Sequence, residues 1–160
     1  MNFEELKLTI PDGCNVILGH SHFIKTVEDL YEVLITGCSS AKFGLAFSEA
    51  SGPCLVRVDG NDEELKKSAA QSLIQIGCGH TFIIYLKNSF PINFLNAIKN
   101  VSEVCRIHCA TANPIIVLIA RMEQGGAIIG VVDGASPKGI EDIEYTNSRK
   151  KFLRDIGYKR

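Results

Sequence analysis

The sequence has no long hydrophobic run, and its longest uninterrupted apolar stretch is IIVLIA at 115–120. This stretch is far too short to cross a bilayer, so the sequence predicts no transmembrane helix. The N-terminus, MNFEELKLTI, carries acidic residues where a secretory signal peptide needs basic ones. We therefore expect a cytoplasmic protein that has no membrane partner.

The chain also lacks a large charge of either sign, since its net charge is −1 over 160 residues. Without a general positive field, a nucleic-acid partner is not expected. Basic residues gather only in the C-terminal stretch SRKKFLRDIGYKR, which we interpret as the solvated face of a helix. Hydrophobic residues make up 46% of the chain and charged residues 22%, which is ordinary for a globular protein.

The cysteines form no CxxC pair, and their spacing fits no standard zinc pattern. Because a cytoplasmic chain keeps its thiols reduced, we expect most of them to be small core residues. The stretch GHSH places His20 and His22 on one face of a predicted strand, so a metal is conceivable there, although no further ligand is identified. The cysteines are Cys14, Cys38, Cys54, Cys78, Cys105 and Cys109.

Motifs of several common enzyme classes are absent. The sequence contains no GxxxxGKS or GxxxxGKT, which excludes a P-loop protein. It contains neither GxSxG nor HExxH, so it gives no support to a nucleophile-elbow hydrolase or to a zinc protease of the HExxH type. No low-complexity linker, internal repeat or charge block divides the chain, so we expect one domain.

Hydrophobic periodicity and turn residues predict a series of short strands and four helices. Hairpin-length turns between helical units indicate an α/β fold: a single domain with a mixed β-sheet, hairpins and about four covering helices. The strand TFIIYL is almost wholly apolar, so we expect it to be covered on both faces. The predicted strands cover 6–10, 15–19, 42–47, 54–58, 81–86, 103–110, 115–122 and 127–134, and the predicted helices cover 25–37, 60–77, 92–100 and 140–156.

The ends of the first two predicted helices follow from local chemistry. Thr26 can cap the first helix, and Gly37 can end it. Asn61, with Glu64 three residues on, resembles a capping box at the start of the second helix. Gly77 is expected to stop that helix.

The stretch GCGHTF at 77–82 joins a predicted helix to an apolar strand and carries the first candidate for chemistry, His80. Histidine is suited to proton transfer or phosphoryl acceptance near neutral pH, and the flanking glycines let the backbone approach a ligand closely. The alternative is a turn histidine with satisfied hydrogen bonds.

Three polar loops follow predicted strands, where α/β proteins tend to bind ligands. Glu49 in FSEASG could bind a ribose hydroxyl, a metal or an amine, or it could lie in a plain hairpin loop. Asp59 and Asp62 in VDGND suit magnesium or ribose, and they suit a turn and a helix cap at least as well. Thr111 and Asn113 in CATANP could read a base or sugar, or simply connect two strands.

Two lysines are candidates for contact with phosphate. Lys87 ends the strand TFIIYLK, and Lys99 lies on the third predicted helix together with Asn93. The alternative is that a lysine at a strand end extends its ammonium group to solvent.

Several long segments together resemble the adenosine-specific kinase family of archaea and some bacteria. They are HFIKTVEDLYE, KFGLAFSEASG, RVDGNDEEL, GCGHTFIIYLKNSFPINFLNAIKNVSEVCRI, CATANP and GVVDG, and the similarity runs from about residue 3 to residue 159. The resemblance implies a single α/β domain over 1–160, binding of adenosine or an adenine nucleotide, phosphoryl transfer, and a small homo-oligomer with a trimer favoured. It also implies a histidine that carries phosphate stably, and the glycine-flanked motif maps this role to His80.

The sequence departs from the family pattern in two places. The turn EQGGAIIG has no arginine where the family often has one, so one phosphate contact would be missing if that arginine contacts phosphate. His108 stands where the family is expected to have an aromatic residue such as tyrosine, so no family-wide role is assigned to it.

The leading interpretation is a phosphotransferase that acts on adenosine or an adenine nucleotide through a phosphohistidine at His80. ATP, AMP or another donor would supply the phosphate, Lys87 and Lys99 would neutralise its oxygens, and Glu49 and Asn113 would bind the nucleoside. The alternative is a non-catalytic sensor that holds an adenine nucleotide without turnover, because no standard kinase motif and no clear general base is present. An accompanying Mg²⁺ would be held by Asp59, Asp62 or Asp133.

Overall fold

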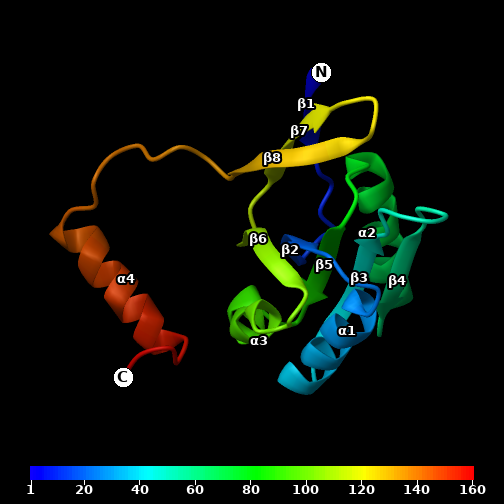
Figure 1. Cartoon of the computed structure of the whole chain (residues 1–160). Helices are drawn as coiled ribbons and strands as arrows, with labels where there is room; N and C mark the ends of the chain where they lie inside the picture. The colour runs from blue at the N-terminus through cyan, green and yellow to red at the C-terminus, as the bar shows by residue number, and fades with distance from the viewer.

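Two β-sheets form the body of the protein in the computed structural model, which describes residues 1–160 (Figure 1). The smaller sheet has the strand order β1–β7–β8 and the larger sheet has the order β4–β3–β5–β2–β6. The strands are β1 (Asn2–Lys7), β2 (Asn15–Ser21), β3 (Lys42–Ser48), β4 (Val56–Gly60), β5 (Thr81–Lys87), β6 (Val104–Thr111), β7 (Ile115–Arg121) and β8 (Gly126–Asp133). The helices are α1 (Thr26–Gly37), α2 (Glu63–Ile76), α3 (Leu95–Lys99) and α4 (Ile143–Asp155), with a 3-10 turn η1 (Pro91–Asn93).

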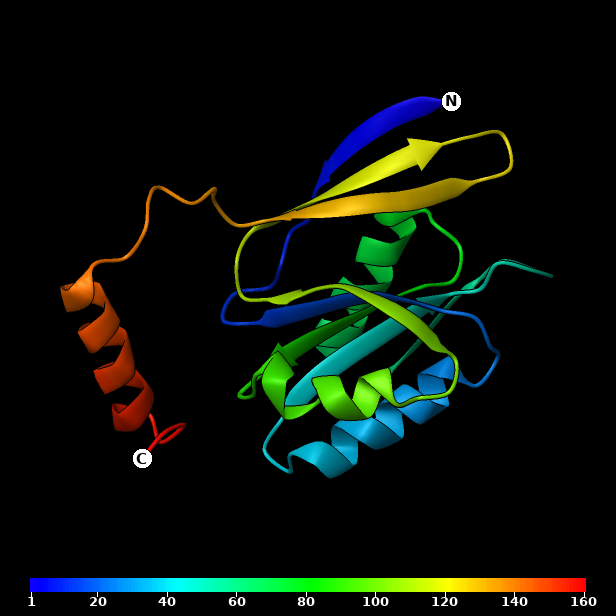
Figure 2. The same cartoon turned by 60° about the vertical axis from the view of Figure 1, so that its left-hand side comes forward.

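The larger sheet is buried on both faces. Helices α1 and α3 cover one face, and α2 together with the smaller sheet covers the other (Figure 2). Every residue of β5 from Thr81 to Leu86 is buried, which confirms that this strand is covered on both faces. Fully buried side chains such as Phe43 and Phe82 each stabilise the fold by about 1.5–3 kcal/mol.

The α/β class, the hairpins and the four helices are confirmed, but the arrangement of the strands differs from the expected mixed sheet. Every pair of neighbouring strands is antiparallel, and the strands divide into two sheets. Strand periodicity reports which residues are buried and does not report which strands pair. The first strand also lies earlier than predicted, at Asn2–Lys7, because its partner β7 is long enough to pair with the N-terminal residues.

The strands at the centre of the fold pair with segments far along the chain. Strand β2 lies between β5 and β6, so that His20 faces Thr81 on one side and Arg106 on the other. Strand β1 pairs with β7, where Phe3 faces Ala120.

Helix α2 lies very close to β3 and delivers the chain to the candidate site. A Cβ atom added at Gly44 would lie 2.1 Å from the carbonyl carbon of Leu65, so only glycine permits this approach. Gly77 ends α2 in the left-handed conformation, at φ 56°, and its N–H donates to the carbonyl of Leu73. This confirms the predicted stop at Gly77.

The predicted N-caps at Thr26 and Asn61 were wrong, whereas the alternative role of Asp62 as a helix cap is confirmed. The cap of α2 is Asp62, whose carboxylate accepts a hydrogen bond from the N–H of Leu65, while Asn61 instead joins strand β3 by accepting from the N–H of Phe43. The cap position of α1 is Lys25, which makes no side-chain cap bond. Thr26 points its hydroxyl at the carbonyl of Phe23 and at Ser21, because it is buried.

Helix α4 stands away from both sheets and covers neither of them, contrary to the expectation of four covering helices (Figures 1 and 2). None of its residues is buried, although Ile143, Tyr145 and Phe152 are apolar or aromatic. Asp142 caps its start by accepting from the N–H of Tyr145. The helix therefore leaves its apolar side chains without a partner in this chain.

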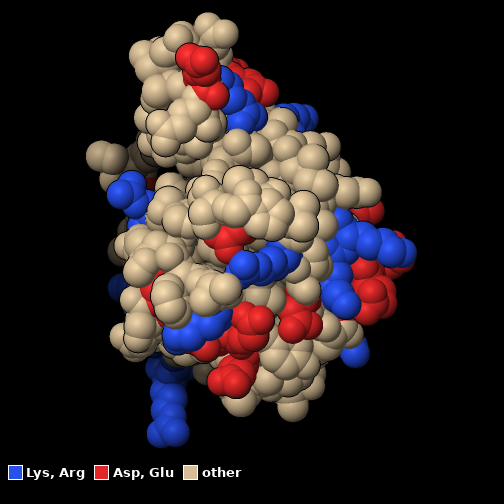
Figure 3. All heavy atoms as spheres, turned by 45° about the vertical axis from the view of Figure 1, so that its right-hand side comes forward, with Lys and Arg blue, Asp and Glu red and all other residues tan.

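The charged side chains seen in Figure 3 are of both signs, and the cysteines form no disulfide. Positive and negative side chains are interspersed over the face seen in Figure 3, in keeping with the net charge of −1. All six cysteines are free, and three of them, Cys14, Cys78 and Cys109, are buried. None of the helices combines the length and the apolar character needed to cross a membrane.

Candidate active site

His80 is held in a backbone conformation that non-glycine residues rarely adopt. Its φ is 57°, in the left-handed region, which costs an L-residue about 1–2 kcal/mol. The surrounding strands fix this geometry, because the N–H of His80 donates to the carbonyl of Ser48 at 2.8 Å and its carbonyl accepts from the N–H of Ser21 at 2.9 Å. The imidazole also stacks on the buried ring of Phe47. Strain of this kind is typical of functional positions.

The side chain of His80 lines a pocket of about 700 Å³, a volume in the range of small-molecule sites. Glu49 lines the same pocket, with its Oε1 atom 4.0 Å from Nε2 of His80. The other carboxylate oxygen of Glu49 lies 2.6 Å from a guanidinium nitrogen of Arg57, which holds the carboxylate in place. The apolar part of the wall comes from Val56, Leu73, Ile74, Met122 and Ala127.

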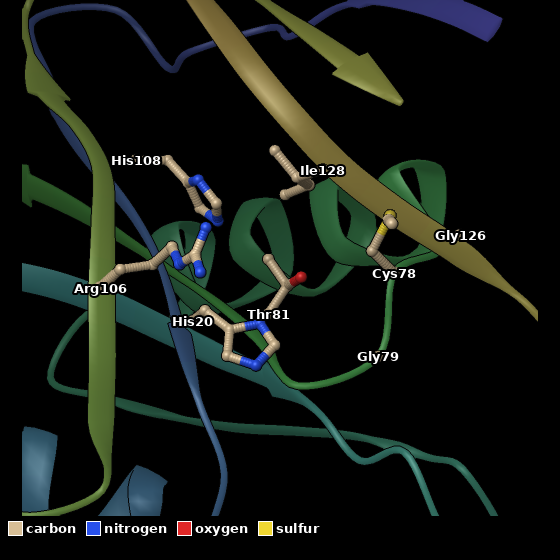
Figure 4. Close-up of a pocket in the computed structure, with 9 residues that line it drawn as sticks. His20, Cys78, Gly79, Thr81, Arg106, His108, Gly126 and Ile128 are labelled. Atoms are coloured by element: carbon tan, nitrogen blue, oxygen red, sulfur yellow. The ribbon is translucent and has the colours of Figure 1, made fainter. Parts of the chain in front are cut away.

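A smaller cavity of about 220 Å³ adjoins this pocket (Figure 4). The strand register creates it, because Thr81, His20 and Arg106 face one another across β5, β2 and β6. His108, two residues beyond Arg106 on β6, also lines the cavity, at a point where the register of β6 against β2 shifts by one residue. The two cavities share Cys78, Gly79, Gly126 and Ala127 as lining residues.

Basic side chains gather around this smaller cavity, with Arg106 between the histidines His20 and His108. Burial lowers the pKa of His20, and the neighbouring His80, Arg106 and His22 lower it further. Burial also lowers the pKa of His108, with further contributions from Arg106 and His20. The rings of His20 and His80 meet edge to face with centroids 6.0 Å apart. His80 therefore lies at the junction of the two cavities.

Arg121 fixes the loop that carries His80. Its guanidinium donates to the carbonyl oxygen of Gly77 at 3.0 Å and to that of Gln75 at 3.3 Å, and it pairs with Glu4 at 2.7 Å. These bonds satisfy carbonyl groups at the C-terminus of α2 that have no partner within the helix. The smaller sheet is thereby tied to the glycine loop, where Cys78 bridges to Gly126.

Several residues predicted from the sequence lie far from His80. Lys87 is at the opposite end of β5 from Thr81, roughly 20 Å away at the usual rise of a strand. Asn113 is also at that end of the fold, where its amide donates to Asp133 and its N–H is bonded to the hydroxyl of Thr111. These contacts give Thr111, Asn113 and Asp133 a local structural role.

The other predicted residues also have local partners or lie in solvent. Asn93 caps η1 by accepting from the N–H of Phe90, and Lys99 is exposed in the last turn of α3. Asp59 accepts from the N–H of Gly60, and Asp62 caps α2. Within one chain Asp59, Asp62 and Asp133 do not meet, and no group of three histidine, cysteine, aspartate or glutamate side chains is arranged to hold a metal.

Comparison with known proteins decides the family. The family model described as adenosine specific kinase matches residues 6–159, nearly the whole chain. The chain belongs to the adenosine specific kinase family. It is also similar to a solved structure, the PH1918 protein from Pyrococcus horikoshii OT3, at 43% identity and a TM-score of 0.95, with 99% of this chain and 98% of that chain covered. None of the curated proteins compared with the chain matches it.

Two of the residues predicted for this adenosine specific kinase family member, His80 and Glu49, lie in one pocket, whereas the basic groups around them were not predicted as part of the site. Arg106 and His108 could have been found from the alternation in RIHC, which places both on one face of a strand. His20 was considered only as a metal ligand. No local pattern marks Arg121, because its carbonyl partners are far away in the sequence.

Proposed function

We propose that this protein transfers a phosphoryl group to or from adenosine or an adenine nucleotide, with His80 as the residue that carries the phosphate. The observation that carries the proposal is the imidazole of His80, which lines a pocket of suitable size while two backbone hydrogen bonds hold the residue in a strained conformation. Membership of the adenosine specific kinase family supports a kinase-like role on adenosine.

The proposed transfer has two steps. A nitrogen of the His80 imidazole attacks the phosphorus of the donor, so that an N–P bond forms while the P–O bond to the leaving group breaks. A hydroxyl oxygen of the nucleoside then attacks the same phosphorus. The N–P bond breaks, its electron pair returns to the imidazole, and the hydroxyl proton passes to solvent. ATP is the donor class that we propose to test first.

The larger pocket supplies the groups that would position the nucleoside. One carboxylate oxygen of Glu49 pairs with Arg57, and the carboxylate can accept hydrogen bonds from ribose hydroxyls. The apolar wall beside it offers a surface for the base, as is usual in small-molecule sites. Positioning of this kind supplies much of the catalysis in phosphoryl transfer.

Replacement of His80 by asparagine tests the role of the imidazole. Asparagine tolerates the left-handed conformation better than other polar residues, so His80→Asn should keep the fold. His22→Asn is the matched control, because His22 is exposed and lines neither cavity. After incubation of the full chain with ATP, mass spectrometry at neutral pH should detect phosphate on the wild type and on His22→Asn only. Undiminished labelling of His80→Asn would refute the assignment.

A non-catalytic nucleotide sensor is the second candidate. The contact between Glu49 and Arg57 favours it, because the guanidinium occupies one oxygen of the only carboxylate that lines the pocket beside His80. Calorimetry with adenosine and with AMP, alongside a product assay, separates the two functions. Tight binding without product or phosphohistidine would support the sensor.

We also propose that the protein works as a homo-oligomer, with a trimer as the favoured form. The exposed apolar side chains of α4 support this, because they have no partner in their own chain. Light scattering on the full chain and on a chain that ends at Asp133 tests it. A monomeric full chain would refute the oligomer, and an oligomer that survives the truncation would show that α4 is not its interface.

A further inference from the structure

The smaller cavity beside His80 has the size of a subsite rather than of a nucleoside pocket. Its volume of about 220 Å³ lies below the usual range for small-molecule sites. Through the shared Cys78, Gly79, Gly126 and Ala127 it is continuous with the larger pocket. A ligand in the larger pocket could therefore extend one small group into it.

The polar lining of this cavity consists mainly of hydrogen-bond donors. Figure 4 shows the guanidinium of Arg106 beside the imidazole of His108, with the ring of His20 and the hydroxyl of Thr81 facing the same space. The side chains are carried by neighbouring strands of a buried sheet, which fixes their spacing. An arginine fork with hydroxyl and imidazole donors is well suited to the oxygens of an anion.

No carboxylate balances these groups. Arg106 takes part in none of the ion pairs of the chain. Glu49, which lines the adjoining larger pocket, is held by Arg57, and the buried Glu103 pairs with Lys25. The charged or titratable neighbours that affect His20 and His108 are all arginine or histidine.

We propose that Arg106, His108, His20 and Thr81 form a subsite for a phosphate dianion, either inorganic phosphate or the phosphate of a nucleoside monophosphate. The subsite places that phosphate next to His80, and its link to transfer rests on the proposed function. Because His108 departs from the aromatic residue expected in the family, the proposal concerns this chain.

Calorimetry on the full chain with inorganic phosphate, AMP and adenosine tests the subsite. In Arg106→Gln we expect the affinity for phosphate to fall about ten- to a hundredfold, as for loss of a charge-assisted contact. If the phosphate of AMP uses the subsite, AMP loses affinity by a similar factor while adenosine binding is unchanged. If only free phosphate uses it, AMP affinity stays the same. The matched control is Arg149→Gln on α4, whose side chain pairs with Glu141 and lies outside both cavities.

Histidine NMR gives a readout that a general loss of stability would not produce. Bound phosphate should raise the pKa values of His20 and His108, because a nearby anion favours the protonated imidazole and offsets the basic neighbours, Arg106 above all, that lower both values. His108→Phe serves as a second variant if Arg106→Gln does not fold. Absence of phosphate binding by the wild type, or equal affinity in both arginine variants, would overturn the subsite.

The outcome is separable from that of the proposed function. His80→Asn should still bind phosphate while losing the covalent label. Phosphate binding without any label on the wild type would leave the subsite in place and refute transfer through His80. A label on His80 without measurable phosphate binding would refute the subsite and leave transfer through His80 in place.

Discussion

Replacement of Gly44 by alanine tests how closely α2 must approach the larger sheet. The added methyl group would lie 2.1 Å from the carbonyl carbon of Leu65 and 2.3 Å from the nitrogen of Lys66, whereas ordinary contacts begin at 3.4 Å. Helix α2 must therefore retreat by about 1 Å, because these atoms belong to the backbone and cannot rotate away. Overpacking costs about 1–3 kcal/mol, and we expect about 3 kcal/mol here.

Urea denaturation followed by circular dichroism measures this cost. Gly130→Ala is the matched control, since an added methyl group there meets nothing within 4 Å and its backbone is not in the left-handed region. We expect the control to stay within about 0.5 kcal/mol of the wild type. A loss of about 3 kcal/mol in Gly44→Ala corresponds to roughly 6–12 °C in melting temperature for a domain of this size. Equal urea midpoints for the two variants would show that α2 can move away from the larger sheet without a loss of stability.

Two further predictions concern buried and capping groups. Tyr85→Phe removes the 2.7 Å hydrogen bond to buried Ser72, so the free energy of unfolding should fall by about 1–3 kcal/mol in the same denaturation assay. Burial raises the pKa of Tyr85 to about 12 in the folded protein, whereas the unfolded value is about 10. The wild type should therefore lose stability as pH rises from about 10 to 12 and Tyr85→Phe should lose less, and equal losses would contradict the burial argument. Asp62→Ala should cost about 1 kcal/mol through loss of the α2 cap, while Glu64→Ala, at the position of the predicted capping box, should cost clearly less by the same measurement.

Local elements of the fold could be predicted because local chemistry determines them. The apolar stripe of α2 and its left-handed stop at Gly77 follow from residues within one segment. The N-cap was displaced by one position because Asn61 has a partner in β3, which the helix sequence does not contain. The division into two sheets depends on which strands pair, and several pairs join residues from opposite ends of the chain.

The candidate site could be predicted only where one short motif carries it. His80 was found because glycines flank it, and Glu49 because it follows a strand. Lys87 and Asn113 also follow strands, but antiparallel strands end alternately at opposite edges of a sheet, so these residues lie away from His80. Arg106 belongs to the cluster only through cross-strand register with His20, which no single segment reveals.

The long-range pairing of the first two strands has a consequence for biosynthesis. Strand β2 gains its partners only when β5 and then β6 have been made, and β1 waits for β7. At about 5–20 residues per second, the nascent chain therefore exposes the apolar segment of β2 for several seconds. The wall around Gly126 is completed later still, so a chain that ends before this point lacks the lining that Gly126 and Ala127 give to both pockets. We expect folding to be slow for a protein of this size and to benefit from chaperones that shield β2.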